Sequence, residues 1–207
     1  MGLRLLRLLA QRGDRARGLI RNPDHARDLE EVGAEAVVCD LEAAEPENIA
    51  ECVAGADAIV FAAGAGAGSG PERKRTMDYG GAAKLIRAAQ EGQIPRYVMV
   101  SAMGTLHPEH WSEQMRPYYE AKAEADRELT ASGLAYTIVR PGGLTDDAGT
   151  GRIEAAPDLE RSGQIPREDV AAVLLAVLDE LATVEKSFDV LSGSTPIGEA
   201  VRHLARD

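Results

Sequence analysis

Short apolar runs alternate with amphipathic stretches along the chain of 207 residues. Parallel β-strands joined by crossover helices produce this pattern, because such strands are covered on both faces while each helix buries one stripe. The apolar runs predict strands at residues 16–20, 36–39, 58–62, 96–101, 135–140 and 187–191. The amphipathic stretches predict helices at residues 24–32, 46–53, 76–91, 118–132, 167–182 and 197–205. We therefore expect an α/β fold in three layers, a doubly wound parallel sheet with helices on both faces, as one domain spanning residues 1–207.

The amino-terminal segment has the pattern of the second half of a dinucleotide-binding βαβ unit. Residues 3–9 carry the apolar stripe of a helix, and residues 16–20 form the strand that follows it. In an intact unit this helix is preceded by a buried strand and a glycine-rich turn, which binds the cofactor pyrophosphate at the helix N-terminus. Only Met1 and Gly2 precede the helix here, so we expect Gly2 at the position of the last glycine of that turn. The first strand of the sheet is expected to be truncated, and we hypothesise that Met1 is an internal start.

Charge and composition argue against several classes of partner. The chain has 23 basic and 34 acidic residues, a net charge of −11, whereas nucleic acids and anionic membranes require a basic face. No stretch approaches the roughly 20 apolar residues of a membrane span. Cys39 and Cys52 match no metal-binding or redox spacing. We expect a cytoplasmic protein, monomeric or weakly homo-oligomeric, that acts on a small molecule and has no nucleic-acid or membrane partner.

Two segments resemble ligand sites but lack the full pattern. Residues 64–70 are rich in glycine, yet they lack both the Gly-Lys-Ser/Thr ending of a P-loop and the Gly-x-Gly-x-x-Gly spacing. We interpret them as a flexible connection after a central strand. His107 and His110 have a spacing that can bind a metal, but the sequence places no further ligand beside them. We expect no metal, and we interpret residues 103–116 as a substrate-side loop with Trp111 as an apolar wall.

The residues after the first two predicted strands indicate which cofactor is preferred. An NAD site usually has Asp or Glu at the end of the first of these strands, where it binds the adenosine ribose. Arg21 and Asn22 stand there instead, and a guanidinium can bind a 2′-phosphate, which favours NADP(H). The alternative is that Arg21 only caps a surface turn. Asp40 could accept from the adenine amino group with Leu41 behind the ring, or Asp40 could simply be a turn residue.

Ser101, Tyr118 and Lys122 form a candidate catalytic group. Tyr118 and Lys122 are four residues apart, so they share one face of a predicted helix, and Ser101 ends a predicted strand. A tyrosine with its ordinary pKa of about 10 is a poor acid or base, and we expect a nearby ammonium and an oxidised nicotinamide to favour the phenolate together. Lys122 could also bind the nicotinamide ribose, and Ser101 could hold a substrate carbonyl. The alternative is that Tyr118 and Tyr119 pack on the helix while Lys122 is solvated.

These motifs resemble the atypical short-chain dehydrogenase/reductases, the NAD(P)-binding proteins similar to NmrA and to biliverdin reductase B. The resemblance implies a Rossmann-like fold over essentially the whole chain. It also implies that Ala62, Ala63 and Gly64 contact the cofactor and that the loop with Pro141, Gly142 and Leu144 passes beside the nicotinamide. The segments that carry the resemblance are residues 17–23, 39–41, 62–64, 78–81, 100–102, 118–122, 132–144 and 165–171.

The resemblance leads to one principal functional expectation and two alternatives. We expect an NADP(H)-dependent oxidoreductase in which Ser101 orients a small carbonyl-type substrate, Tyr118 moves the proton and Lys122 holds the ribose. The first alternative is a non-catalytic NADP(H)-binding redox sensor or regulator, since the fold does not distinguish binding from catalysis. The second is a flavin or quinone reductase, which needs no proton-donating tyrosine.

Overall fold

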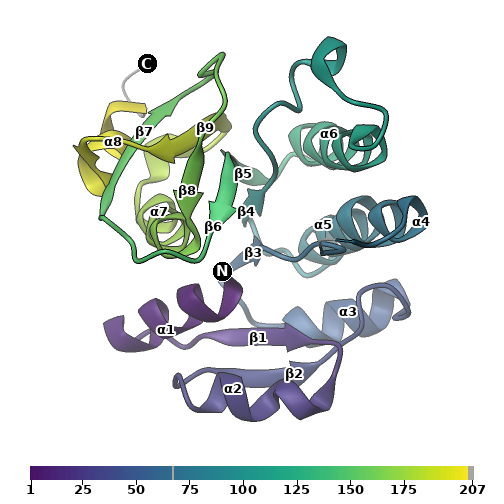
Figure 1. The fold of residues 1–207 in the computed structure, drawn as a ribbon. Helices are drawn as coiled ribbons and strands as arrows, with labels where there is room; N and C mark the ends of the chain where they lie inside the picture. The colour runs from purple at the N-terminus through teal and green to yellow at the C-terminus, as the bar shows by residue number, and fades with distance from the viewer. Residues whose placement is uncertain (67, 205–207) are drawn as a thin grey trace.

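The computed structural model describes residues 1–66 and 68–204 (Figure 1). The strands are β1 (Arg17–Ile20), β2 (Glu35–Val38), β3 (Ala58–Phe61), β4 (Arg96–Val100), β5 (Ala135–Pro141), β6 (Gly143–Thr145), β7 (Arg152–Ala156), β8 (Gln164–Pro166), β9 (Lys186–Ser192) and β10 (Thr195–Pro196). The α-helices are α1 (Gly2–Arg12), α2 (Ala26–Glu30), α3 (Pro46–Val53), α4 (Pro71–Arg73), α5 (Ala82–Glu91), α6 (Arg116–Thr130), α7 (Arg167–Asp179) and α8 (Ile197–Leu204). A π-helix (Lys74–Gly81) joins α4 to α5, and 3₁₀ turns lie at Pro23–His25, Pro108–His110 and Leu181–Thr183.

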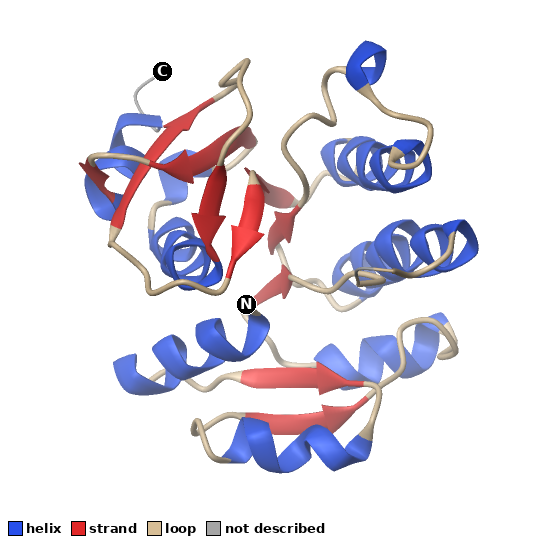
Figure 2. Ribbon diagram, viewed as in Figure 1, coloured by secondary structure: helices blue, strands red, loops and turns tan. Residues whose placement is uncertain are grey.

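The strands form one large, mostly parallel sheet and two small two-stranded sheets (Figure 2). The large sheet has the order β10-β7-β9-β5-β4-β3, in which β3, β4, β5 and β9 are parallel while β7 and β10 are antiparallel to their neighbours. The parallel pair β1–β2 forms a separate sheet, and β6–β8 forms a third. In the described part of the chain, no pairing joins β1 to β3.

Strand β4 shows why the molecule has three layers. All five of its residues are buried, and successive side chains point to opposite faces of the sheet. Tyr97 and Met99 pack into the core under α3, α5 and α6, while Val98 and Val100 pack into the core that contains residues of α1, α7 and α8. Helices therefore cover both faces, and the arrangement is the Rossmann-like one that the sequence predicts.

Several predicted elements have different boundaries in the structure. The helix predicted at residues 76–91 is a π-helix followed by α5, and the one predicted at residues 24–32 is a 3₁₀ turn followed by α2. The last residue of the helix predicted at 197–205 lies outside the described residues. The sequence analysis missed β6, β7, β8 and β10, which are strands of two to five residues. In the described residues no helix combines the length and the apolar character needed to cross a bilayer.

Candidate active site

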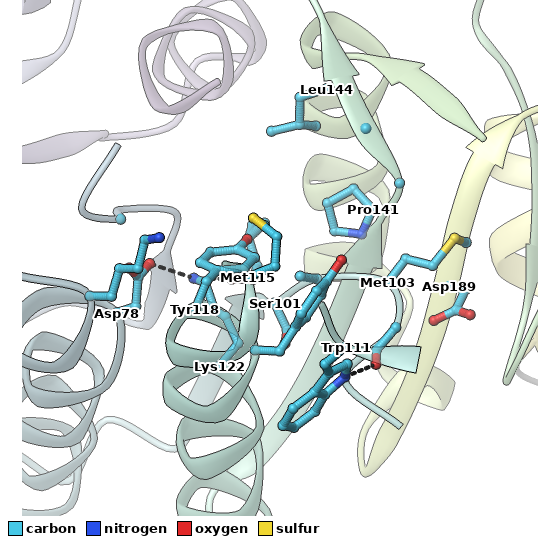
Figure 3. Close-up of a pocket in the computed structure, with 18 of the residues that line it drawn as sticks. Asp78, Ser101, Met103, Trp111, Met115, Tyr118, Lys122, Pro141, Leu144 and Asp189 are labelled. Atoms are coloured by element: carbon cyan, nitrogen blue, oxygen red, sulfur yellow. Dashed lines mark hydrogen bonds and ion pairs between the residues drawn. The ribbon is translucent and has the colours of Figure 1, made fainter. Parts of the chain in front are cut away.

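The carboxyl ends of β3, β4 and β5 open into one cleft, whose volume is about 1540 Å³ (Figure 3). A typical site for one ligand measures roughly 300–1000 Å³, so the cleft has room for a cofactor and a substrate together. The structure brings most of the predicted site residues into its wall: Gly2, Ala62, Ala63, Gly64, Ser101, Tyr118, Lys122, Pro141, Gly142 and Leu144. The other predicted residues, Arg21, Asn22, Asp40 and Leu41, are absent from this wall.

Helix α1 begins at the cleft, where Met1 and Gly2 form part of the wall. The first amides of a helix have no partner within it and carry partial positive charge. No acidic side chain lies in this first turn, and Met1, the residue before it, makes no side-chain cap. Burial and Arg4 lower the pKa of the terminal amino group. Because free backbone donors lie at the cleft here, this end of α1 fits a phosphate group.

Two glycines let the backbone approach closely beside the cleft. A Cβ atom on Gly64 would lie 2.9 Å from Asp78 Oδ1, and one on Gly142 would lie 2.3 Å from Leu191 Cδ2 and 2.5 Å from the Gly163 carbonyl oxygen. All three separations are too short for a real Cβ atom. The resemblance to the reductases named these glycines, and the close packing explains why a larger residue would displace the cleft wall.

Ser101, Tyr118 and Lys122 meet in the cleft, as the sequence predicts. Ser101 follows β4 directly, while Tyr118 and Lys122 lie one turn apart on α6. Without a cofactor, the pKa of Tyr118 is raised by burial and by the nearby Asp78. In the structure the phenol is therefore held in its protonated form.

Lys122 does not favour the Tyr118 phenolate because its ammonium has partners of its own. The side chain is buried rather than solvated. Its Nζ lies 3.4 Å from Asp78 Oδ1 and donates to the Val100 carbonyl oxygen at 3.2 Å (Figure 3). Burial lowers the pKa of Lys122, although Asp78 opposes this shift. The carboxylate offsets the charge that was expected to favour the phenolate, so Lys122 does not tune Tyr118 in the predicted way.

Asp78 and Asp126 are polar groups at the site to which sequence reasoning assigned no role. Asp78 lies in the π-helix, a rare structure often found at functional sites, and Asp78 is almost fully buried. Asp126 accepts a hydrogen bond from Ser101 Oγ at 2.9 Å. One signal could have identified Asp126: it follows Lys122 by four residues, and Tyr118 by eight, on the same helical face.

The predicted adenosine contacts have partners within the protein. Arg21 Nη1 lies 3.4 Å from Glu42 Oε2, and Arg73 Nε binds the same oxygen at 3.2 Å. The Asn22 side chain accepts from the amide of Asp24 and so caps a 3₁₀ turn. The Asp40 carboxylate accepts from the Glu42 amide at 2.9 Å, as the turn alternative proposes. Leu41, which was expected behind the adenine ring, is buried in the core between β2 and α5.

The loop of residues 103–116 forms the opposite wall of the cleft, where the sequence analysis placed a substrate-side loop. Trp111 Nε1 donates to the Gly104 carbonyl oxygen at 2.8 Å (Figure 3). The Trp111 ring stacks on Tyr119 with centroids 5.6 Å apart. Met103 and Met115 also line the cleft. This wall therefore offers flat aromatic and polarisable surface to a ligand.

The histidines of this loop have a third potential ligand that the sequence analysis did not identify. Candidate ligand atoms of His107, Glu109 and His110 lie within 4.8 Å of one another. His107 Nε2, however, lies 2.8 Å from Asp158 Oδ2, and its Nδ1 lies 3.4 Å from Glu109 Oε1. These carboxylates raise the pKa of His107, with Asp158 the larger cause, and so favour an imidazolium ion, which cannot ligate a metal.

Comparison with known proteins agrees with this geometry. A family model described as NAD(P)H-binding matches residues 1–181. YhfK of Bacillus subtilis, described as an uncharacterized sugar epimerase, is 46% identical over 205 residues, which cover 99% of this chain and 95% of YhfK. The structure of a Bacillus halodurans protein assigned as an NAD-dependent epimerase/dehydratase has a TM-score of 0.92 at 38% identity and covers 97% of this chain and 93% of its own. The oxidoreductase ylbE of Lactococcus lactis has a TM-score of 0.87 at 29% identity, with 99% and 91% covered. The chain therefore belongs to the NAD(P)H-binding family, among relatives of oxidoreductase and epimerase type.

Proposed function

We propose that this protein is an NADP(H)-dependent reductase of small, planar carbonyl compounds. The observation that carries the proposal is the meeting of the N-terminal end of α1 with Ser101, Tyr118 and Lys122 in one cleft. Bound NADPH would supply the hydride, as this cofactor does in oxidoreductases. Gly2 and Gly64 lie where its pyrophosphate would be held, Pro141 and Leu144 lie where its nicotinamide would rest, and Arg21 could reach its 2′-phosphate.

The chain's own residues would hold the substrate oxygen and provide its proton. Ser101 and Tyr118 offer hydroxyl groups to one side of the cleft, and the raised pKa of Tyr118 keeps its phenol protonated. A protonated phenol is an acid, which a carbonyl reduction needs as the oxygen gains negative charge.

The stacked pair of Trp111 and Tyr119 supports a flat substrate. Aromatic rings in such a wall bind planar conjugated molecules by offset stacking. Isatin, a planar aromatic carbonyl compound, is therefore a suitable probe for turnover.

The test measures the binding of NADPH and NADH by fluorescence, and the NADPH-dependent reduction of isatin, in the wild type and in Tyr118→Phe. We expect Tyr118→Phe to lower kcat by about a hundredfold or more while the Kd for NADPH stays within about twofold, since only the proton donor is removed. Tyr136→Phe is the matched control, because Tyr136 lies at the start of β5 and its hydroxyl donates only to the Glu185 carbonyl oxygen, at 3.3 Å.

Other outcomes would identify the alternatives. Retention of turnover in Tyr118→Phe would favour flavin or quinone reduction. NADPH binding with no turnover of carbonyl, flavin or quinone compounds would favour a redox sensor, and the absence of binding to either dinucleotide would refute the proposal.

A further inference from the structure

Asp126 lies behind the cleft wall and is linked to the cleft through Ser101. Its Oδ2 accepts hydrogen bonds from Ser101 Oγ at 2.9 Å and from Thr105 Oγ1 at 3.4 Å. Its Oδ1 is buried and has no hydrogen-bond partner among the described residues. An ionised carboxylate needs partners for both oxygens, and leaving one buried and unpaired is costly. A neutral carboxylic acid fits this environment better than a carboxylate.

The charges around Asp126 do not alter this conclusion, because they are already paired. Lys122, on the same helix, interacts with Asp78 of the π-helix, and Arg140 Nε of β5 donates to Asp189 Oδ1 of β9 at 2.8 Å. Tyr118, also on α6, is protonated and carries no charge. Burial raises the pKa of Asp126, although the hydrogen bond from Ser101 and the charges of Arg140 and Lys122 oppose this shift.

The protonation state of Asp126 decides what Ser101 can offer a substrate. A serine hydroxyl has one proton. If Asp126 is ionised, that proton is held by Asp126 Oδ2, and Ser101 presents only lone pairs to the cleft. If Asp126 is protonated, its own O–H can donate to Ser101 Oγ, and the serine proton is then free to point at a substrate oxygen.

We propose that Asp126 is a positioning residue that acts as a neutral carboxylic acid and donates to Ser101, so that Ser101 becomes a hydrogen-bond donor to the substrate oxygen. The inference rests on the role given to Ser101 in the proposed function. No bond to Asp126 is broken in the reaction, because the proton gained by the substrate comes from Tyr118. Ionisation of Asp126 reverses the Ser101 hydrogen bond and therefore switches this donor off.

The protonation of Asp126 can be tested without cofactor or substrate. Infrared difference spectra of the wild type and Asp126→Asn, recorded as the pH is raised, are expected to show a protonated carboxyl band at neutral pH in the wild type alone. Glu120→Gln is the matched control, because it removes one acidic group from an exposed position on the same helix. Absence of an Asp126 carboxyl band at neutral pH would overturn the inference even if the protein proves to be a reductase.

The second measurement separates positioning from folding. Asp126→Ala should lower kcat for isatin by about tenfold or more, since an oriented donor is lost, whereas Asp126→Asn should recover most of that loss through its amide N–H. The wild-type kcat should fall at high pH as Asp126 ionises, and this fall should be absent in Asp126→Asn. In the Ser101→Ala background, Asp126→Ala and Asp126→Asn should have the same kcat. An Asn variant as slow as the Ala variant, with native circular dichroism in both, would refute the role.

Discussion

At the scale of single residues, the ion pair between Lys122 and Asp78 is the strongest local constraint on the cleft. The two side chains are 5% and 2% exposed, so either charge would be stranded if its partner were removed. We expect Asp78→Asn to lower the free energy of unfolding by about 3 kcal/mol, because it leaves the Lys122 ammonium without its carboxylate. Urea unfolding followed by circular dichroism measures this change.

The double variant Asp78→Asn/Lys122→Met serves as the control. It contains neither charge, so it should be more stable than Asp78→Asn alone. If Asp78→Asn alone lowers stability by less than about 1 kcal/mol, or if the second substitution destabilises further, the charge pairing does not explain the burial of Lys122.

Arg21 gives a second prediction at this scale, and it concerns cofactor choice. Its guanidinium is half-exposed and shares Glu42 with Arg73, so a 2′-phosphate would have to compete with Glu42. We expect Arg21→Ala to raise the Kd for NADPH about tenfold and to change the Kd for NADH less than twofold, since only NADPH carries that phosphate. Glu42→Gln should lower the Kd for NADPH.

Fluorescence titration of both dinucleotides measures these effects. Arg27→Ala is the matched control, because Arg27 is an exposed arginine of α2 that pairs with Glu31. Equal weakening of NADPH and NADH by Arg21→Ala would mean that Arg21 does not read the 2′-phosphate.

At the scale of elements, the loop of residues 103–116 is tied down by the ring of Trp111. The chain contains one tryptophan, so its fluorescence reports directly on this wall of the cleft. We expect isatin to quench that fluorescence and Tyr119→Leu to weaken isatin binding roughly fivefold, because loss of the stacked partner costs about 1 kcal/mol. Isatin titrations of the two proteins test this, and unchanged affinity would remove Tyr119 from the substrate wall. The Kd for NADPH should be the same in both.

The elements also show how far the sequence predicts the fold. The central strands were predicted to within about two residues because continuous apolar runs such as the one in β4 mark strands covered on both sides. β6, β8 and β10 have only two or three residues and lie between glycines and prolines, so no periodicity can develop in them. The π-helix was predicted as ordinary helix because its side-chain pattern differs from that of an α-helix by only one residue per turn.

The sequence predicts those site residues whose positions follow from strand ends and helical spacing. It does not predict the residues whose positions depend on packing between elements far apart in the chain. Ser101, Tyr118 and Lys122 were identified because strand ends and helical spacing place them. The Asp78–Lys122 pair joins residues 44 positions apart through the π-helix and α6, and no local pattern specifies that contact. The raised pKa of Tyr118 follows first from its burial and then from the nearby Asp78, and both depend on packing between elements that no local pattern specifies.

At the scale of the whole molecule, Asp126 makes stability depend on pH in a defined direction. Its folded-state pKa is raised above its unfolded value of about 3.9, so the folded protein binds more protons between these two values. The corresponding stability is fully present below the unfolded pKa and is lost as the pH rises through the folded pKa. Asp126→Asn has no such titration, so its unfolding free energy relative to the wild type should increase as the pH rises.

Urea unfolding of the wild type, Asp126→Asn and Glu120→Gln at several pH values, from about 4 to 8, measures the difference. The other titrating groups are common to the wild type and each variant, and they cancel in the comparison. If the wild-type and Asp126→Asn curves remain parallel over this range, the pKa of Asp126 is not raised in the folded protein, and the neutral-acid inference fails.

The division of the sheet has a consequence for how the molecule opens. β1 and β2 exchange backbone hydrogen bonds with each other, while β4 and β5 belong to the larger sheet, and the two parts are joined by packing of α1 on α7 and of α3 on α5. No ladder of backbone hydrogen bonds joins β1–β2 to the larger sheet in the described residues, so the two parts are coupled through side-chain packing. Each part can therefore unfold as its own cooperative unit in amide hydrogen exchange. The β1–β2 unit, which also contains α2, would then open at a lower free energy than the unit that holds Ser101, Tyr118 and Lys122. A ligand lying across both units would raise the protection of the weaker one, and in this sense it would complete the fold.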